Sequence, residues 1–268
     1  MSTAPNNNVR LCEQSMLLEQ DWRTIYETAF PAGEREPESR LQQLINDGKL
    51  LYHKTIGKQG ELLCFSMVSL VSNFSFLAYI ATDPNQRSGG YGSKHMKALL
   101  DLLKKTYPTQ LGLFLEIEST NPKKSQPSAD EKVVRQRRYG FYKRLGSKRL
   151  CRSMDYRVPS HSGDGSEHEF DLLFFNFGDK PLTHAEKAGV VTEIFERLYG
   201  LDKSHALVQQ VTSSALACSH SRCEDDDAPD TGNGGTASTQ GDEKRDEKTA
   251  EKSTVEKSTP PAPEKLAS

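Results

Sequence analysis

The chain has 268 residues, and its 35 Lys+Arg and 37 Asp+Glu give a formal net charge of −2 at pH 7. This balance argues against a basic surface for nucleic acid. No apolar run approaches about 18 residues and no charged amino-terminal segment precedes an apolar one, which argues against a membrane span and a signal peptide. We therefore expect a soluble cytoplasmic protein with neither a nucleic-acid nor a membrane partner.

Two helices are expected first. "DWRTIYETAF" over 21–30 has Asp21 in a capping position and is followed by the helix breaker Pro31. Residues 37–47 place apolar side chains on one face and stop at Gly48, which is typical of a second helix.

Three strand-like runs follow, "LLYHKTI", "ELLCFSMVSLVS" and "FLAYIATD", over 50–56, 61–72 and 76–83. Short turns containing Gly or Asn separate them, so we predict an antiparallel meander. The middle run is apolar on both faces, which predicts a central position in the sheet.

The second half of the folded part alternates between helices and strands. Apolar spacing, capping residues and Gly or Pro breaks define these elements. In chain order we expect a helix from Tyr91, a strand over 111–119, a polar link over 120–132, a helix over 133–146 with Val134 on its apolar face, strands over 149–158 and 170–177, and a helix over 183–200. This order predicts a mixed α/β (α+β) sheet with helices packed on it.

The C-terminal segment differs in composition from the rest. Residues 221–268 hold 12 Asp+Glu and 7 Lys+Arg with very few large apolar residues, and "EKTA", "EKSTV" and "EKSTP" follow one another there. Such a segment cannot bury enough apolar surface to offset its ordering entropy. We expect one folded domain over residues 1–212 and a disordered acidic tail over 213–268.

The stretch "RSGGYG" lies between the third strand-like run and the following helix. Gly89, Gly90 and Gly92 let a ligand approach the backbone without a side chain in the way. The unpaired N–H groups at the helix start and the positive end of the helix dipole favour a pyrophosphate. Arg87 is placed to add a charge-assisted contact.

Other phosphate-binding loops fit this stretch poorly. A P-loop requires Gly-Lys-Ser/Thr, but Lys94 is followed by His95. A dinucleotide fingerprint requires a third glycine where His95 stands, and no parallel strand unit precedes it.

Three segments together resemble the GCN5-related N-acetyltransferase (GNAT) family. "YIATDPNQRSGGYGSKHMKALL" resembles its acetyl-CoA motif, while "LFLEIESTN" and "RRYGFYKRLG" resemble its next strand and helix. The resemblance spans roughly Arg10 to Leu201 and includes the element order. It implies the acyl-CoA N-acyltransferase fold, in which a splayed central sheet is flanked by helices and acetyl-CoA lies in the opening.

The resemblance also implies how the cosubstrate is held. The backbone of Ile80 and Thr82 would contact the pantetheine arm, although Ile80 is equally explained by packing, and an N–H near Thr82 would polarise the thioester carbonyl. Asn121 would also contact the pantetheine, but the insert over 122–136 departs from the family pattern and leaves its placement open. The pyrophosphate would contact Arg87, Ser88, Gly89, Gly90, Tyr91, Gly92 and Ser93.

The chemistry requires a base and an acid. A lysine-like amine has a pKa of about 10.4 and must lose a proton before it attacks a thioester. Glu116 and Glu118 lie on one face of a strand. Glu116 matches a position resembling the catalytic glutamate of ribosomal-protein alanine acetyltransferases, so we expect it to be the general base. Glu118 is the second choice, and a structural pairing of either glutamate with Arg137 or Arg138 is the alternative.

The departing thiolate needs a proton because a free thiol has a pKa of about 8.5. Tyr142 matches the usual general acid of the family, and the alternative is a buried aromatic that anchors its helix. For the acceptor amine, Glu34 and Arg35 of "FPAGERE" and Glu118 are candidate contacts, although exposed loop charges are ordinarily just solvated.

The five cysteines are odd in number and scattered, which predicts reduced thiols. Cys64 and Cys151 have no His neighbour in sequence, so a covalent intermediate is not indicated. No His/Cys set has zinc-finger spacing, and we expect no metal.

The predicted function is acetyl-CoA-dependent transfer of an acetyl group to a primary amine of a small molecule or a protein, directly within a ternary complex. The alternative is a non-catalytic acyl-CoA-binding module that engages partners through its tail. The sequence does not indicate the oligomeric state.

Overall fold

The computed structural model describes residues 10–14, 20–160 and 165–218. The acidic segment predicted to be disordered lies almost entirely outside these residues. Within them, none of the helices combines the length and the apolar composition needed to cross a membrane.

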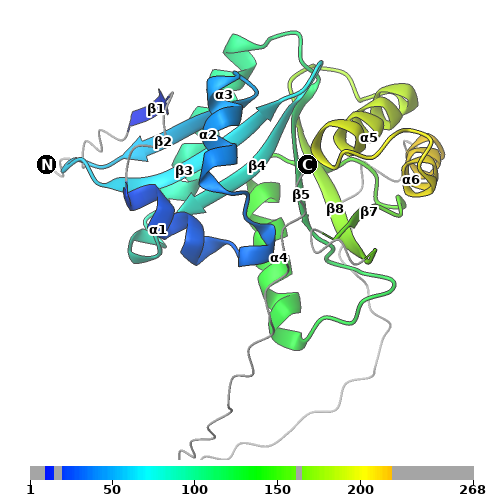
Figure 1. Ribbon diagram of the computed structural model, residues 1–268, viewed down its shortest axis with the longest axis horizontal. Coiled ribbons are helices and arrows are strands. Elements are labelled where there is room, and N and C mark those ends of the chain that lie inside the picture. Colours follow the sequence, from blue (N-terminus) through cyan, green and yellow to red (C-terminus); the bar gives the residue numbers. More distant parts are fainter. Residues whose placement is uncertain (1–9, 15–19, 161–164, 219–268) are drawn as a thin grey trace, which may run out of the picture. The chain divides into compact units, whose positions relative to one another are not determined.

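Eight strands form one mixed sheet in the described part of the chain, in the order β1-β2-β3-β4-β5-β8-β6, with β7 paired to β8 (Figure 1). Only β4 and β5 are parallel neighbours there. The strands are β1 Arg10–Gln14, β2 Leu50–Ile56, β3 Leu62–Leu70, β4 Ser75–Thr82, β5 Gly112–Glu118, β6 Lys148–Arg149, β7 Arg157–Pro159 and β8 Glu167–Asn176.

The sheet splays open at its centre. β4 and β5 pair only at Ser75↔Leu113 and Phe76↔Phe114, near the start of each strand, and then diverge (Figure 1). The antiparallel meander β2-β3-β4 and the central, buried position of β3 are confirmed. The opening between β4 and β5 is therefore bounded by the two strands that carry the candidate site.

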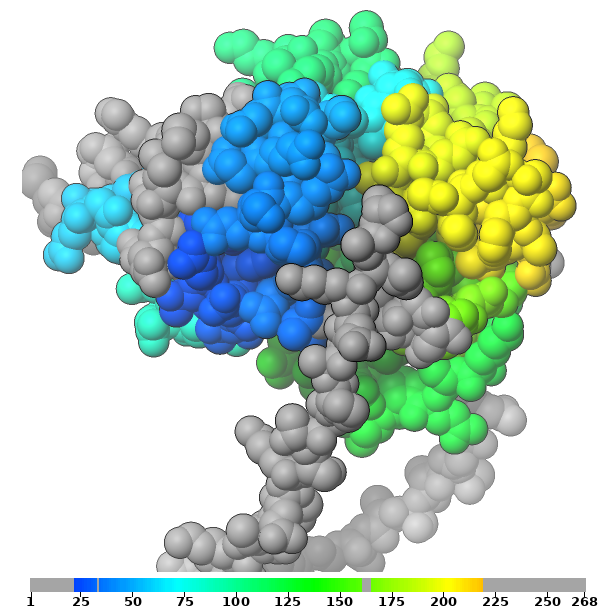
Figure 2. All heavy atoms as spheres, in the orientation of Figure 1, coloured from blue at the N-terminus to red at the C-terminus, as the bar shows by residue number. Residues whose placement is uncertain are grey.

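Helices cover both faces of the sheet. Side chains alternate between faces along a strand. On β5, Phe114 packs with α5 and α6, whereas Leu113 and Leu115 pack with α3 and α4. On the face seen in Figure 2, α1 and α2 (blue) lie beside α5 (yellow). The helices are α1 Gln20–Ala29, α2 Glu38–Asn46, α3 Tyr91–Thr106, α4 Ala129–Arg144, α5 His184–Leu198 and α6 Ala206–Leu216, with 3-10 turns η1 Ala32–Glu34 and η2 Pro84–Gln86.

Two helix predictions need correction. α1 begins at Gln20, so Asp21 lies inside the helix instead of capping it. α4 begins at Ala129, within the segment predicted as a link, because Ser128 and Glu131 form a capping box. Val134, predicted on the apolar face of this helix, is 49% exposed because this half of α4 extends beyond the sheet.

The region after α4 differs most from the prediction. The strand expected over 149–158 is split into the short strands β6 and β7. Helix α6 was not predicted and runs past residue 212, the expected end of the domain. Cys151 and Cys218 form a disulfide with their Cα atoms 6.1 Å apart, so the prediction that all cysteines are reduced is wrong. The two cysteines are 67 residues apart in sequence, and no spacing pattern indicates that they pair.

Candidate active site

The glycine-rich turn delivers β4 onto the start of α3. Ser88 and Gly90 have φ values of 69° and 73°, in the left-handed region. Gly90 is the N-cap of α3, and no side chain caps this helix. The first intrahelical bond runs from Lys94 N to Gly90 O at 3.1 Å. The N–H groups of residues 91–93 precede it and therefore point out of the helix end, where the helix dipole is positive.

Gly92 is closely packed against two other elements. A Cβ added there would lie 3.0 Å from Thr82 Oγ1 and 3.8 Å from the ring of Phe141. The first turn of α3 therefore touches both the end of β4 and α4. This contact brings together β4 and α3, to which the sequence assigned the cosubstrate, and α4, which carries the predicted acid Tyr142.

The remaining candidate cosubstrate residues differ in exposure. Ile80 is partly buried and packs against the core shared by α3 and α4. Arg87 and Asn121 are exposed. The Asn121 N–H donates to Ser119 Oγ at 3.3 Å, which fixes its backbone at the end of β5.

Glu116 lies on β5, partly buried, on the sheet face that also carries α5. Its Oε1 accepts a hydrogen bond from the Tyr156 hydroxyl at 2.5 Å, and its Oε2 accepts one from the Tyr199 hydroxyl at 2.6 Å. Burial raises the pKa of the Glu116 carboxyl, while the two hydroxyl donors oppose this rise. A carboxylate whose pKa lies closer to neutrality is a stronger base than a free glutamate.

Glu118 has a different environment. It forms an ion pair with Arg138 on α4. This contact corresponds to the structural pairing that the sequence left open, and it occupies the Glu118 carboxylate.

Tyr142 lies on α4 and is 6% exposed. Burial raises the pKa of its hydroxyl to about 12, although the Arg138 charge opposes this rise. The hydroxyl therefore keeps its proton at neutral pH.

Cys64 is a buried thiol on β3. Burial raises its pKa to about 12, and the Thr82 hydroxyl donates to its sulfur at 3.6 Å. Since the thiolate is the nucleophilic form, this thiol is unreactive at neutral pH.

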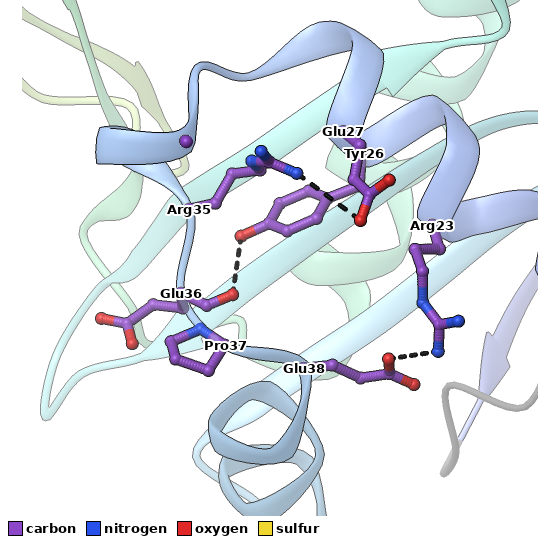
Figure 3. Close-up of a pocket in the computed structure, with 8 residues that line it drawn as sticks. Arg23, Tyr26, Glu27, Arg35, Glu36, Pro37 and Glu38 are labelled. Carbon is purple, nitrogen blue, oxygen red and sulfur yellow. Dashed lines mark hydrogen bonds and ion pairs between the residues drawn. The ribbon is translucent and has the colours of Figure 1, made fainter. Parts of the chain in front are cut away.

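A shallow pocket of about 270 Å³ lies where α1 meets α2 (Figure 3). Two ion pairs lie in its lining, because Arg23 pairs with Glu38 and Arg35 lies 3.6 Å from Glu27, and Glu36 adds a further negative charge. Arg35 therefore lies in the pocket, whereas Glu34 is not among the lining residues. The pocket is lined by Arg23, Tyr26, Glu27, Ala32, Arg35, Glu36, Pro37 and Glu38.

Tyr79 on β4 links the α1–α2 connection to the interior. Its hydroxyl donates to the Glu34 carbonyl at 2.9 Å and accepts from the Glu36 N–H at 3.3 Å. Tyr79 also contributes to the raised pKa of Tyr199, after the larger effects of burial and the Glu116 charge. The Tyr79 hydroxyl therefore holds the connection containing Glu34 and Arg35 against β4.

Sequence reasoning missed Tyr79, Tyr156 and Tyr199. A buried carboxylate requires hydrogen-bond donors, so donors for Glu116 were predictable in kind. Their identity was hidden, because Tyr156 and Tyr199 lie 40 and 83 residues away in sequence.

Among the residues that the structure describes, no group of three or more His, Cys, Asp or Glu side chains is arranged to hold a metal ion.

Comparison with known proteins gives one family match. Residues 19–124 match the model of the acetyltransferase (GNAT) family. No curated protein sequence matches the chain.

Several solved structures are similar to this chain, and one aligns well enough to show a shared fold. An acetyltransferase of the GNAT family from Bacteroides thetaiotaomicron is 20% identical, covers 67% of this chain and 90% of its own, and aligns with a TM-score of 0.53. The ribosomal-protein-S18-alanine N-acetyltransferase from Escherichia coli is 18% identical over 64% of this chain and 96% of its own, with a TM-score of 0.43. Spermidine N-acetyltransferase from Vibrio cholerae, in complex with CoA and spermine, is 13% identical over 62% and 95%, with a TM-score of 0.44.

Proposed function

Since the chain contains an acetyltransferase domain of the GNAT family over residues 19–124, we propose that it transfers the acetyl group of acetyl-CoA directly to a primary amine within a ternary complex. The observation that carries this proposal is the partly buried Glu116 carboxylate, whose pKa is raised. It lies on β5, which diverges from β4, the strand that leads into the glycine turn.

The glycine turn supports the placement of acetyl-CoA. The amides of residues 88–93 hold the pyrophosphate, and the uncapped start of α3 favours its negative charge. Arg87 is exposed beside this turn and adds a charge-assisted contact. The pantetheine arm runs between β4 and β5 along the backbone of Ile80 and Thr82, where the two strands no longer hydrogen-bond to each other. Asn121, at the end of β5, borders the same opening.

Glu116 removes the proton from the acceptor ammonium. The amine nitrogen then attacks the thioester carbonyl carbon, and a backbone N–H near Thr82 stabilises the developing oxyanion. As the C–N bond forms and the C–S bond breaks, the sulfur receives a proton from Tyr142, and the second proton of the amine nitrogen is released to solvent, from which the Tyr142 hydroxyl is restored. The pKa of Tyr142, raised to about 12, keeps that proton available.

The acceptor enters from the side of the α1–α2 connection. Tyr79 anchors the backbone of Glu34 on this side, and the Arg35 side chain borders the adjacent pocket. A cationic amine suits the negative charge of Glu116. Glu118 lies at the rim of the site and contributes only a weak contact to the acceptor, because its carboxylate is paired with Arg138.

Thiol release from acetyl-CoA, measured across a panel of amines and peptides, tests the proposal. We expect wild type to turn over at least one acceptor and Glu116→Gln to lower kcat/KM by about 10²-fold or more. Tyr142→Phe should lower kcat by about 10-fold or more, with little change in acetyl-CoA affinity.

Glu118→Gln is the matched control. It neutralises a carboxylate two residues along the same strand, and we expect a change below about 10-fold because that carboxylate is already paired with Arg138. Thermal stabilisation by acetyl-CoA without turnover of any acceptor would instead favour a non-catalytic acyl-CoA-binding module.

A further inference from the structure

The Glu116 carboxylate is held by two tyrosines from a part of the chain beyond the family match. Tyr156 lies between β6 and β7, and Tyr199 is the C-cap residue of α5. Each hydroxyl donates to a different carboxylate oxygen, at 2.5 and 2.6 Å. Both tyrosines follow residue 124, where the match to the family model ends.

The two hydroxyls are fixed by a layer of aromatic rings. Tyr156 is 3% exposed, and its ring centroid lies 6.0 Å from that of Phe195. The Phe195 centroid in turn lies 5.7 Å from that of Tyr199. The Leu201 N–H donates to the Phe195 carbonyl at 3.0 Å and closes the end of α5, which orients Tyr199.

Helix α6 supports the Tyr156 side of this arrangement. The N–H of Asp155 donates to Ser214 Oγ on α6 at 3.1 Å. The disulfide between Cys151 and Cys218 joins the segment before Tyr156 to the residues that follow α6. The C-terminal helices therefore determine where the Tyr156 hydroxyl lies.

We infer that Tyr156 and Tyr199 are positioning residues that hold the Glu116 carboxylate toward the acceptor through one hydrogen bond to each of its oxygens. This inference rests on the proposed function. Each carboxylate oxygen has two lone pairs, so one on each oxygen stays available to the acceptor amine or to a water that relays its proton.

The charge environment supports the same role. The groups that act on the pKa of Glu116 in the described part of the chain are these two hydroxyls, which oppose the effect of burial. Nearby charges are engaged elsewhere, since Glu118 pairs with Arg138 and Asp171 pairs with Arg149. The carboxylate is thus stabilised by neutral donors instead of a cation, which leaves its negative charge for a cationic acceptor.

The test is the pH dependence of kcat/KM for wild type, Tyr156→Phe and Tyr199→Phe. Phenylalanine keeps the ring and removes the donor, so the Glu116 carboxylate loses one stabilising hydrogen bond. A hydrogen bond to a charged group corresponds to roughly one pH unit. We expect the acidic limb of the profile to move to higher pH by about that amount in each variant, with acetyl-CoA affinity unchanged.

A second readout is the carboxyl pKa of Glu116, followed by ¹³C NMR of glutamate-labelled protein and assigned with Glu116→Gln. It should rise in step with the kinetic limb in both variants. Tyr107→Phe, at the far end of α3, is the matched control and should leave the limb and the Glu116 signal in place. Melting temperatures verify that each variant is folded.

The outcomes separate the inference from the function on which it rests. If wild type turns over, Glu116→Gln does not, and neither phenylalanine variant shifts the limb or the NMR signal, the positioning role is rejected while the base assignment stands. If Glu116→Gln is as active as wild type, the proposed base is rejected, and the positioning role falls with it.

Discussion

The cosubstrate side and the acid–base side of this site are built in different ways. The cosubstrate side is a short continuous segment, in which β4, the glycine turn and the start of α3 follow one another in sequence. The acid–base side joins Glu116 on β5 to Tyr156 and Tyr199, which belong to elements much later in the chain. In the proposed function, main-chain groups bind the cosubstrate. Side chains brought together by tertiary packing carry out the acid–base chemistry.

This difference explains how the two sides can vary. A backbone site needs only the turn geometry and a few glycines, so it is recognisable as a motif. A carboxylate site needs donors, and any element that reaches the carboxylate can supply them. The segment before β7 and the end of α5 supply them here, outside the part matched by the family model.

Removing the disulfide should have the largest effect on stability. Its effect on function should be limited to the acid–base side. Cys218→Ser opens a link between residues 67 positions apart. A loop of this length corresponds to about 3–4 kcal/mol of unfolding free energy. Denaturant unfolding under oxidising conditions measures the loss, while acetyl-CoA affinity should stay unchanged.

A reducing agent provides the control for this prediction. It should lower the stability of wild type to that of Cys218→Ser and leave the variant unaffected. Mass spectrometry after alkylation tests the bond directly. Free thiols at both 151 and 218 in wild type purified without reductant would contradict it.

A valine in the glycine turn should damage the cosubstrate side alone. Gly90 has a φ of 73°, so Gly90→Val costs roughly 1–2 kcal/mol of stability and distorts the amides that precede α3. We expect thermal stabilisation by acetyl-CoA to disappear while the protein stays folded.

Gly60→Val is a matched control, because Gly60 has a φ of 88° and, like Gly90, has nothing within 4 Å of an added Cβ. It should cost similar stability without weakening acetyl-CoA binding. Equal acetyl-CoA affinity in the two variants would show that the turn does not bind the pyrophosphate.

Two buried histidines, His53 on β2 and His95 on α3, predict a smaller, pH-dependent effect. Burial lowers the pKa of His53 to about 4, and burial followed by the charge of His53 lowers that of His95 to about 3. Because both pKa values are depressed on folding, their stabilisation is fully present above about pH 6.5 and is lost as pH falls toward 4. Each histidine contributes a slope of up to about 1.4 kcal/mol per pH unit.

His53→Leu should reduce this slope by about half, since it removes one of the two histidines and the His53 ring makes no hydrogen bond to the described part of the chain. His168→Gln, at an exposed position on β8, is the control and should leave the slope unchanged. Denaturant unfolding between pH 4 and 7 measures both, and an unchanged slope in His53→Leu would contradict the account.

Local patterns predicted the first half of the fold well. The meander β2-β3-β4 and helix α3 follow from alternation, turn residues and three-to-four spacing, which act over short distances. Both ends of α5 were equally clear, because the capping box of Thr183 and Glu186 at its start and Gly200 after its end are sequence-local signals.

The later part was predicted less well because its structure depends on long-range contacts. The segment over 149–158 has strand-like composition, but its ends pair with different parts of β8. The side-chain partners of Glu116 were likewise hidden, since no local pattern connects position 116 to positions 156 and 199. Glu116 and Tyr142 were singled out as catalytic only by their resemblance to a family motif, and their roles stay predictions.

The most direct measurement is a crystal structure with coenzyme A bound. The account predicts that the diphosphate oxygens accept hydrogen bonds from the amides of residues 88–93 and that the pantetheine arm lies between β4 and β5. A diphosphate bound at any other place on the molecule would contradict it.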